Sequence, residues 1–151
     1  MIKRLKPIKR SPLRKISRKR ASGKADYKKA YTEQDREIMD NMGYISCSSC
    51  GIVLVDGSGN SGRPWGHSHN MPVKHFPELE ADPKNFSPRC QDWMGRRGCH
   101  EVLDTPDFRD IIHFNDFHEL MAYRREHDVN AYNQWVTQLK AIGYEEYDYI
   151  D

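Results

Sequence analysis

The chain has 151 residues, of which 37% are hydrophobic and 30% are charged. This length suits one folded unit, and the low apolar fraction leaves little hydrophobic burial to offset the entropy of ordering that unit. We therefore expect an additional structural staple. No run of about 18 apolar residues occurs, so the sequence predicts no membrane span.

The charge is unevenly distributed along the chain. The formal net charge is +2, but residues 1–30 hold eight Lys, five Arg and one Asp, a net of +12, so the remainder carries −10. Residues 1–25 mix these cations with Pro and Ser without apolar periodicity, which predicts a disordered or weakly helical basic arm. Such an arm can neutralise the phosphates of DNA or RNA, and the alternative is a solubilising tail. The expected nucleic-acid-binding residues of the arm are Lys3, Arg4, Lys9, Arg10, Arg14, Lys15, Arg18, Lys19 and Arg20.

Residues 26–43 are rich in helix formers and predict a helix that leads into the folded domain, with Thr32 as a plausible N-cap and an end near Gly43. Residues 44–51 predict a strand that turns through a knuckle, and residues 52–55 predict the returning strand.

The middle of the chain predicts extended and irregular structure. We expect a Gly- and Ser-rich loop over residues 56–62, an extended segment over 65–73, an irregular stretch over 74–84, a short turn or helix over 85–90 and a loop over 91–98.

The stretch from residue 117 to residue 142 is the most helix-like part of the chain. Its apolar residues recur at spacings near 3 and 4, and the pattern breaks around residues 128–130. This predicts two helices within a C-terminal extension, residues 115–151, behind a central domain at residues 44–114.

Four cysteines form two pairs. Cys47 and Cys50 have two residues between them, whereas Cys90 and Cys99 have eight. Since the basic start lacks the apolar region of a signal peptide, we expect a cytoplasmic, reducing location, where clustered Cys more often bind metal than form disulfides. A tetrahedral zinc site with four thiolate ligands would supply the staple. The alternatives are four free buried cysteines or a single redox CxxC pair.

Three candidate catalytic residues follow the first cysteine pair. His69 and Asn85 lie between the two pairs, and His100 directly follows Cys99. Phosphodiester hydrolysis needs a base for water, a divalent cation on the phosphate and a polar group that orients the base, and these residue types can provide all three. Histidines in a loop are also common as plain surface residues.

The order CxxC, His, Asn, Cys-His resembles the treble-clef HNH endonucleases, which have a ββα-metal fold. The stretch SHNMPVKHFPELEADPKN, residues 68–85, is similar to the segment that holds the first His and the middle Asn of that family. The basic start and the late helix around residues 132–139 also resemble phage recombination nucleases of the NinG type. The resemblance covers roughly residues 44–104. It implies an α+β fold, in which a small zinc-stabilised HNH-like domain has flanking helices.

The resemblance also implies residue roles. His69 would be the general base, Asn85 would orient or support it, and His100 would bind the catalytic Mg²⁺ or another divalent cation. The four cysteines would hold a separate structural Zn²⁺. Many family members have Asp directly before the base, where this chain has Ser68; His67 is a tentative substitute ligand or a phosphate contact.

Arg96 and Arg97 lie in the loop between the second pair of cysteines. They could grip the DNA backbone or belong to a solvated turn.

The resemblance implies a metal-dependent DNA endonuclease, a phosphodiester hydrolase encoded by a phage and acting in recombination, replication or packaging in the host cytoplasm. Duplex, nicked and branched DNA all remain open as substrates. The chief alternative is a non-catalytic zinc-dependent nucleic-acid-binding protein. A further alternative is a zinc-stabilised interaction module whose basic arm binds an acidic partner.

Overall fold

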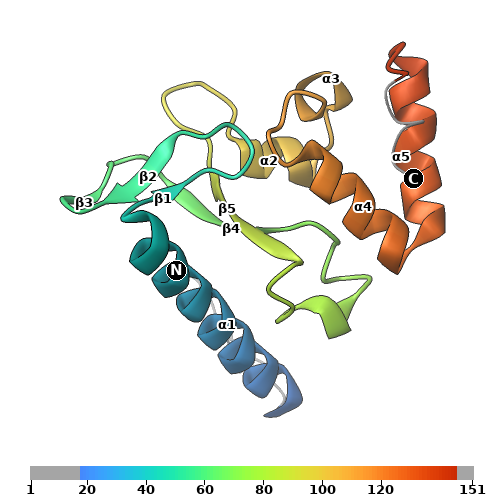
Figure 1. Ribbon diagram of the computed structural model, residues 1–151. Coiled ribbons are helices and arrows are strands. Elements are labelled where there is room, and N and C mark those ends of the chain that lie inside the picture. The colour runs from blue at the N-terminus through green and yellow to red at the C-terminus, as the bar shows by residue number, and fades with distance from the viewer. Residues whose placement is uncertain (1–17, 146–151) are drawn as a thin grey trace, which may run out of the picture.

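The computed structural model describes residues 18–145, which form a small α+β structure with helices around two antiparallel sheets (Figure 1). The expected DNA-binding residues Lys3, Arg4, Lys9, Arg10, Arg14 and Lys15 lie outside the described residues. The helices are α1 (Arg18–Met42), α2 (Cys99–Asp104), α3 (Phe108–Ile111), α4 (Phe117–His127), α5 (Val129–Ala141) and a short 3-10 helix, η1 (Pro77–Leu79). The strands are β1 (Ile45–Ser46), β2 (Val53–Asp56), β3 (Gly59–Asn60), β4 (Trp65–His69) and β5 (Phe86–Cys90). None of the described helices is both long and apolar enough to cross a membrane.

Helix α1 begins at Arg18, earlier than the predicted start at residue 26, and ends at Met42, directly before Gly43 as predicted. The predicted N-cap at Thr32 is wrong, because this residue lies inside the helix and its hydroxyl donates to the Lys28 carbonyl at 2.8 Å. The upstream Lys, Arg and Ala residues have high helix propensity, so the helix continues through the point where a cap was expected.

The first sheet has the strand order β1-β2-β3 and contains the predicted knuckle hairpin. Ile45 pairs with Val55, and the N–H of Cys47 donates to the Ile52 carbonyl at 2.8 Å. This confirms the strand and the returning strand that residues 44–55 predicted.

The second sheet consists of β4 and β5. The two strands pair from Trp65 opposite Cys90 to His69 opposite Phe86. The predicted short turn or helix over residues 85–90 is wrong. The segment becomes a strand because β4, far away in the sequence, supplies its backbone hydrogen bonds, and such long-range pairing leaves no local signal.

The C-terminal stretch forms two helices, α4 and α5, as predicted. The break falls at Asp128, whose carboxylate accepts hydrogen bonds from the N–H groups of Asn130 and Ala131 and so caps α5. The two helices pack against each other on the side of the β4–β5 hairpin away from α1 (Figure 1).

One hydrophobic core joins the knuckle hairpin to the C-terminal helices. Leu54 of β2, Ile111 of α3, Leu120 of α4 and Leu139 of α5 are all almost completely buried in the same cluster. Burying a Leu or Ile side chain stabilises a fold by about 1.5–3 kcal/mol. The predicted central domain and C-terminal extension therefore share a core.

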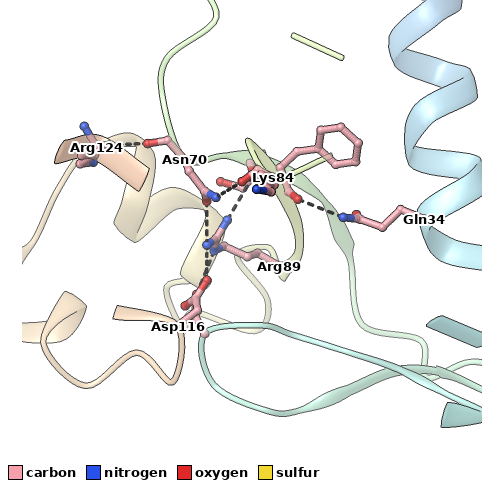
Figure 2. Close-up of polar contacts among 9 residues, drawn as sticks. Gln34, Asn70, Lys84, Arg89, Asp116 and Arg124 are labelled. Carbon is pink, nitrogen blue, oxygen red and sulfur yellow. Dashed lines mark hydrogen bonds and ion pairs between the residues drawn. The ribbon is translucent and has the colours of Figure 1, made fainter. Parts of the chain in front are cut away.

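A buried arginine links the two sheets to α4. Arg89 of β5 donates to the Ser49 hydroxyl at 2.8 Å, to the Ser68 carbonyl at 3.1 Å and to the Asn70 side-chain oxygen at 3.1 Å. It also forms an ion pair with Asp116, just before α4 (Figure 2). A buried guanidinium is costly unless it is paired in this way, so these contacts fix the knuckle, β4 and α4 relative to one another.

Candidate metal centre and active site

The four cysteines, which are far apart in the sequence, lie together in the structure. Their Sγ atoms are all within 4.8 Å of one another, and the Cys50 and Cys90 sulfurs are 3.8 Å apart. A zinc ion with bonds of about 2.3 Å to four sulfurs requires sulfur–sulfur distances of roughly 3.8 Å. The cluster of Cys47, Cys50, Cys90 and Cys99 could therefore bind a metal ion such as zinc.

The first cysteine pair lies in the tight turn after β1. The N–H of Gly51 donates to the Cys47 carbonyl at 2.8 Å. Gly51 has a φ of +75°, a backbone conformation that residues other than Gly adopt only at a cost in free energy. Gly51 thus permits the turn that brings Cys50 back toward Cys47.

The second pair is brought together by the loop between β5 and α2. Cys90 is the last residue of β5 and Cys99 is the first of α2, and the Cys99 N–H points at the Cys90 sulfur at 3.5 Å. A Cβ atom on Gly98 would lie 2.3 Å from the backbone carbon of Gln91. Glycine is therefore required where this loop closes.

The thiols of the cluster differ in acidity. A hydrogen bond from the Cys99 thiol lowers the pKa of Cys47 to about 4. The same interaction raises the pKa of Cys99, and burial raises the pKa of Cys50 to about 11. Cysteine binds a metal ion as the thiolate, so metal binding at this cluster would release protons.

The end of β4, the segment that follows it, α2, α4 and α5 line an open cavity of about 520 Å³. Both His69, at the end of β4, and His100, in the first turn of α2, line this cavity. Its other polar and charged lining residues are Lys74, Glu80, Asp104 and Arg124. Two of the three predicted catalytic residues thus meet in one site.

The imidazole of His69 is half-buried against α1 and the loop that follows β4. Its Nε2 lies 3.4 Å from the Glu80 carbonyl oxygen, and its ring centre lies 5.1 Å from that of Tyr27. Burial disfavours the imidazolium and lowers the pKa of His69 below its ordinary value of 6.5. At neutral pH the ring is therefore uncharged and able to accept a proton.

His100 is oriented by an acidic residue one turn further along α2. Its Nδ1 lies 3.2 Å from Oδ2 of Asp104, and 4.0 Å from Oε1 of Glu101. When Nδ1–H donates to a carboxylate, the lone pair of the ring is on Nε2, the tautomer that binds metals through that atom. Asp104 was not among the predicted site residues, although its i,i+4 spacing from His100 in a helix is a readable signal.

Asn85 is completely buried behind the cavity rather than in its lining. Its Oδ1 accepts from the Met71 N–H at 2.7 Å, and its Nδ2 donates to the carbonyls of Met71 at 3.3 Å and Leu79 at 3.0 Å. These bonds close the loop after His69, which includes the lining residue Lys74. The side chain thus supports the shape of the cavity.

His67 lies outside the cavity lining. Its Nε2 is 2.9 Å from Oδ1 of Asp35 on α1, and its ring stacks on Tyr31 with centres 4.7 Å apart. His67 and His69 share the face of β4 that contacts α1, and both rings contact Phe86. Its surroundings thus connect His67 to α1, not to His100.

Ser68, directly before His69, is almost completely buried on the other face of β4. Its hydroxyl oxygen has no hydrogen-bond partner within the described residues, and its carbonyl accepts from Arg89.

The two arginines in the loop after β5 differ in their contacts. Arg97 donates to the carbonyls of Glu101 at 3.0 Å and Thr105 at 2.9 Å, so its guanidinium provides hydrogen bonds for carbonyl groups at the C-terminal end of α2. Arg96 is exposed, and its backbone pairs with that of Trp93 at 3.0 Å.

Comparisons of the chain with protein-family models, with curated proteins and with solved structures find no match.

Proposed function

We propose that this protein is a metal-dependent DNA endonuclease of the HNH type. The observation that carries the proposal is the shared cavity of His69 and His100, which come from a β-hairpin and from the first turn of the following helix. A base and a metal ligand held on two rigid elements around one cavity suit hydrolysis of a phosphodiester.

The cysteine cluster supports the treble-clef part of the proposal. Two ligands come from a knuckle in a hairpin, and a third, Cys99, comes from the first turn of a helix. Because His100 is adjacent to Cys99, a structural zinc would hold the metal-ligating histidine in place.

The catalytic divalent cation would be bound by Nε2 of His100, whose ring Asp104 would orient through Nδ1. Mg²⁺ usually keeps several water ligands and binds phosphate oxygens of the substrate, which would complete its coordination. The bound cation would neutralise charge on the phosphate and at the leaving 3′ oxygen.

His69 performs the proton transfer in this mechanism. It takes a proton from a water molecule in line with the scissile bond, the water oxygen bonds to phosphorus, and the P–O3′ bond breaks. The 3′ oxygen then takes a proton from solvent, and the other product carries a 5′-phosphate. Asn85 takes no proton in these steps; it maintains the loop beside the base.

The charge of the basic arm supports DNA as the substrate. Tyr27 of α1 contacts His69, and α1 begins nine residues earlier at Arg18, about 13 Å along the helix axis. Residues 1–17, which precede Arg18 in the sequence, include seven Lys and Arg. Their charge would attract a polyanion such as DNA.

Nicking of supercoiled plasmid by the zinc-loaded full chain tests the proposal. We expect nicking with Mg²⁺ or Mn²⁺ and loss of about 100-fold or more in rate for His69→Ala, since general-base catalysis contributes 10²–10⁴-fold. His113→Ala is the matched control, because His113 is exposed and outside the cavity lining. A His69→Ala protein that nicks as fast as wild type would refute the assignment.

A zinc-dependent nucleic-acid-binding protein without catalysis is the second candidate. It is favoured by the fact that, within residues 18–145, the four cysteines are the only group of three or more Cys, His, Asp or Glu side chains placed to share a metal ion. DNA binding that is equal in wild type and His69→Ala, without nicking by either protein, would support this candidate.

A further inference from the structure

The most unusual side chain of the candidate cavity is Arg124, on α4. Only 6% of this residue is exposed, yet within the described part of the chain it forms no ion pair. Its Nη2 donates to the Asn70 carbonyl at 2.6 Å, and its Nε has no partner among the described residues (Figure 2). A guanidinium has five N–H donors, so much of its hydrogen-bonding capacity is not satisfied by the protein.

Arg89 provides the comparison within the same molecule. Both arginines bind Asn70, Arg124 at the carbonyl oxygen and Arg89 at the side-chain oxygen (Figure 2). Arg89 is compensated by Asp116, whereas Arg124 is not. Burying a cation without a counter-ion costs several kcal/mol. A purely structural role for Arg124 does not explain this cost, whereas binding of an anion in the adjacent cavity does.

The position of Arg124 is fixed by its aromatic neighbour. Its guanidinium carbon lies 3.7 Å from the centre of the Trp135 ring on α5. Stacking on one face leaves the donors at the edge of the guanidinium that Asn70 does not occupy available for hydrogen bonds to phosphate oxygens. The side chain is therefore held in advance of ligand binding.

The surroundings of Arg124 identify the ligand class. Arg124 lines the cavity together with His69 and His100, and the exposed Lys74 adds a second cation to the same lining, which also holds the carboxylates of Glu80 and Asp104. We infer that Arg124 and Lys74 bind the phosphate that is hydrolysed, with the Arg124 guanidinium as the counter-ion of a non-bridging oxygen. This inference rests on the proposed function and adds a phosphate-binding residue that lies outside the HNH-like segment.

Binding of inorganic phosphate tests the site without requiring catalysis. The zinc-loaded full chain, free of Mg²⁺, is melted over a series of phosphate concentrations at constant ionic strength. Phosphate is expected to raise the melting temperature of wild type and of the control Arg125→Met, which removes an exposed cation from the same helix. Arg124→Met is expected to lose this response, and a response equal to that of wild type would overturn the inference.

Two further variants keep the test decisive if Arg124→Met does not fold. Arg124→Lys retains the charge but loses the planar fork, so we expect its phosphate affinity to fall about tenfold. Lys74→Met changes an exposed side chain and should weaken phosphate binding with the fold intact. A wild-type response in both variants would overturn the inference.

Nicking kinetics then separate this inference from the proposed function. Arg124→Met is expected to lower kcat/KM about 100-fold, the usual effect of removing one donor to the transition state. If wild type binds phosphate through Arg124 but does not nick, the phosphate site stands and the endonuclease proposal fails. If wild type nicks and a folded Arg124→Met nicks equally well, the endonuclease proposal stands and the inference fails.

Discussion

Asn85 holds Met71 by two hydrogen bonds, because its side-chain oxygen accepts from the Met71 N–H at 2.7 Å and its amide nitrogen donates to the Met71 carbonyl at 3.3 Å. Asn85 thus supports the candidate site without lining the cavity. It sets the course of the loop that begins directly after His69, and the cavity depends on that loop.

Replacing Asn85 should therefore affect stability as well as nicking. Asn85→Ala leaves the Met71 N–H and the carbonyls of Met71 and Leu79 without these partners, which should cost at least about 2 kcal/mol. Asn85→Asp should be at least as harmful, because a carboxylate would face the two carbonyl oxygens. Chemical denaturation measures the loss, and Asn133→Ala on the exposed face of α5 is the control. A fully stable Asn85→Ala protein that does not nick would instead indicate a direct catalytic role.

The cysteine cluster predicts one tightly bound zinc per chain, about 1.0 by elemental analysis of the purified protein. Cys47→Ser should lose the metal and unfold the domain, because the four ligands join the knuckle, β5 and α2. Ser48→Ala, in the same turn, keeps all four thiols and should retain both metal and fold. A stable wild-type protein that contains no metal after purification would contradict a structural zinc.

The buried imidazole of His69 predicts the acid limb of the pH profile. Because burial lowers its pKa, kcat/KM should stay constant through neutral pH and fall at an inflection below 6.5, the ordinary value. The buried neutral imidazole of His69 also makes the stability of the fold depend on pH in the same direction. Its contribution to the free energy of unfolding is complete above pH 6.5 and is lost as pH falls through the lowered pKa. Rates measured from pH 5 to 8 check this, and the limb should persist in His113→Ala. An inflection at or above 6.5 would contradict the assignment of His69 as a buried base.

The basic arm should control DNA affinity and its dependence on salt. Each phosphate contact contributes about 0.9 to the slope of log K against log salt. Deleting residues 1–17 removes seven cations and should weaken binding and flatten this slope. A full-length variant with Gln at the same seven positions should behave alike, since charge rather than length is responsible. Unchanged affinity and slope in both proteins would leave the arm without this role.

The sequence by itself determined the local features. Cys47 and Cys50, with Gly51 behind them, predicted the knuckle, because a tight turn is encoded within a few adjacent residues. The sequence also predicted the helix boundaries near Gly43 and Asp128, because capping signals lie within one turn of the end of a helix. The closeness of the four thiols was expected, and the structure brings their sulfurs together.

Only the tertiary structure decided which distant groups meet. Strand β5 exists because β4 pairs with it, and His67 contacts Asp35 of α1 rather than the cavity. Asp104 joins the site through the α2 turn next to His100, and Arg124 reaches it from α4 because the shared core packs that helix there. The i,i+4 spacing of Asp104 from His100 is a local signal, but no local pattern marks Arg124 or the partner of His67, since their roles depend on burial and on neighbours that are remote in sequence. The sequence thus specified the metal cluster and the two histidines as candidates, and the packing of the helices added the charged groups around them.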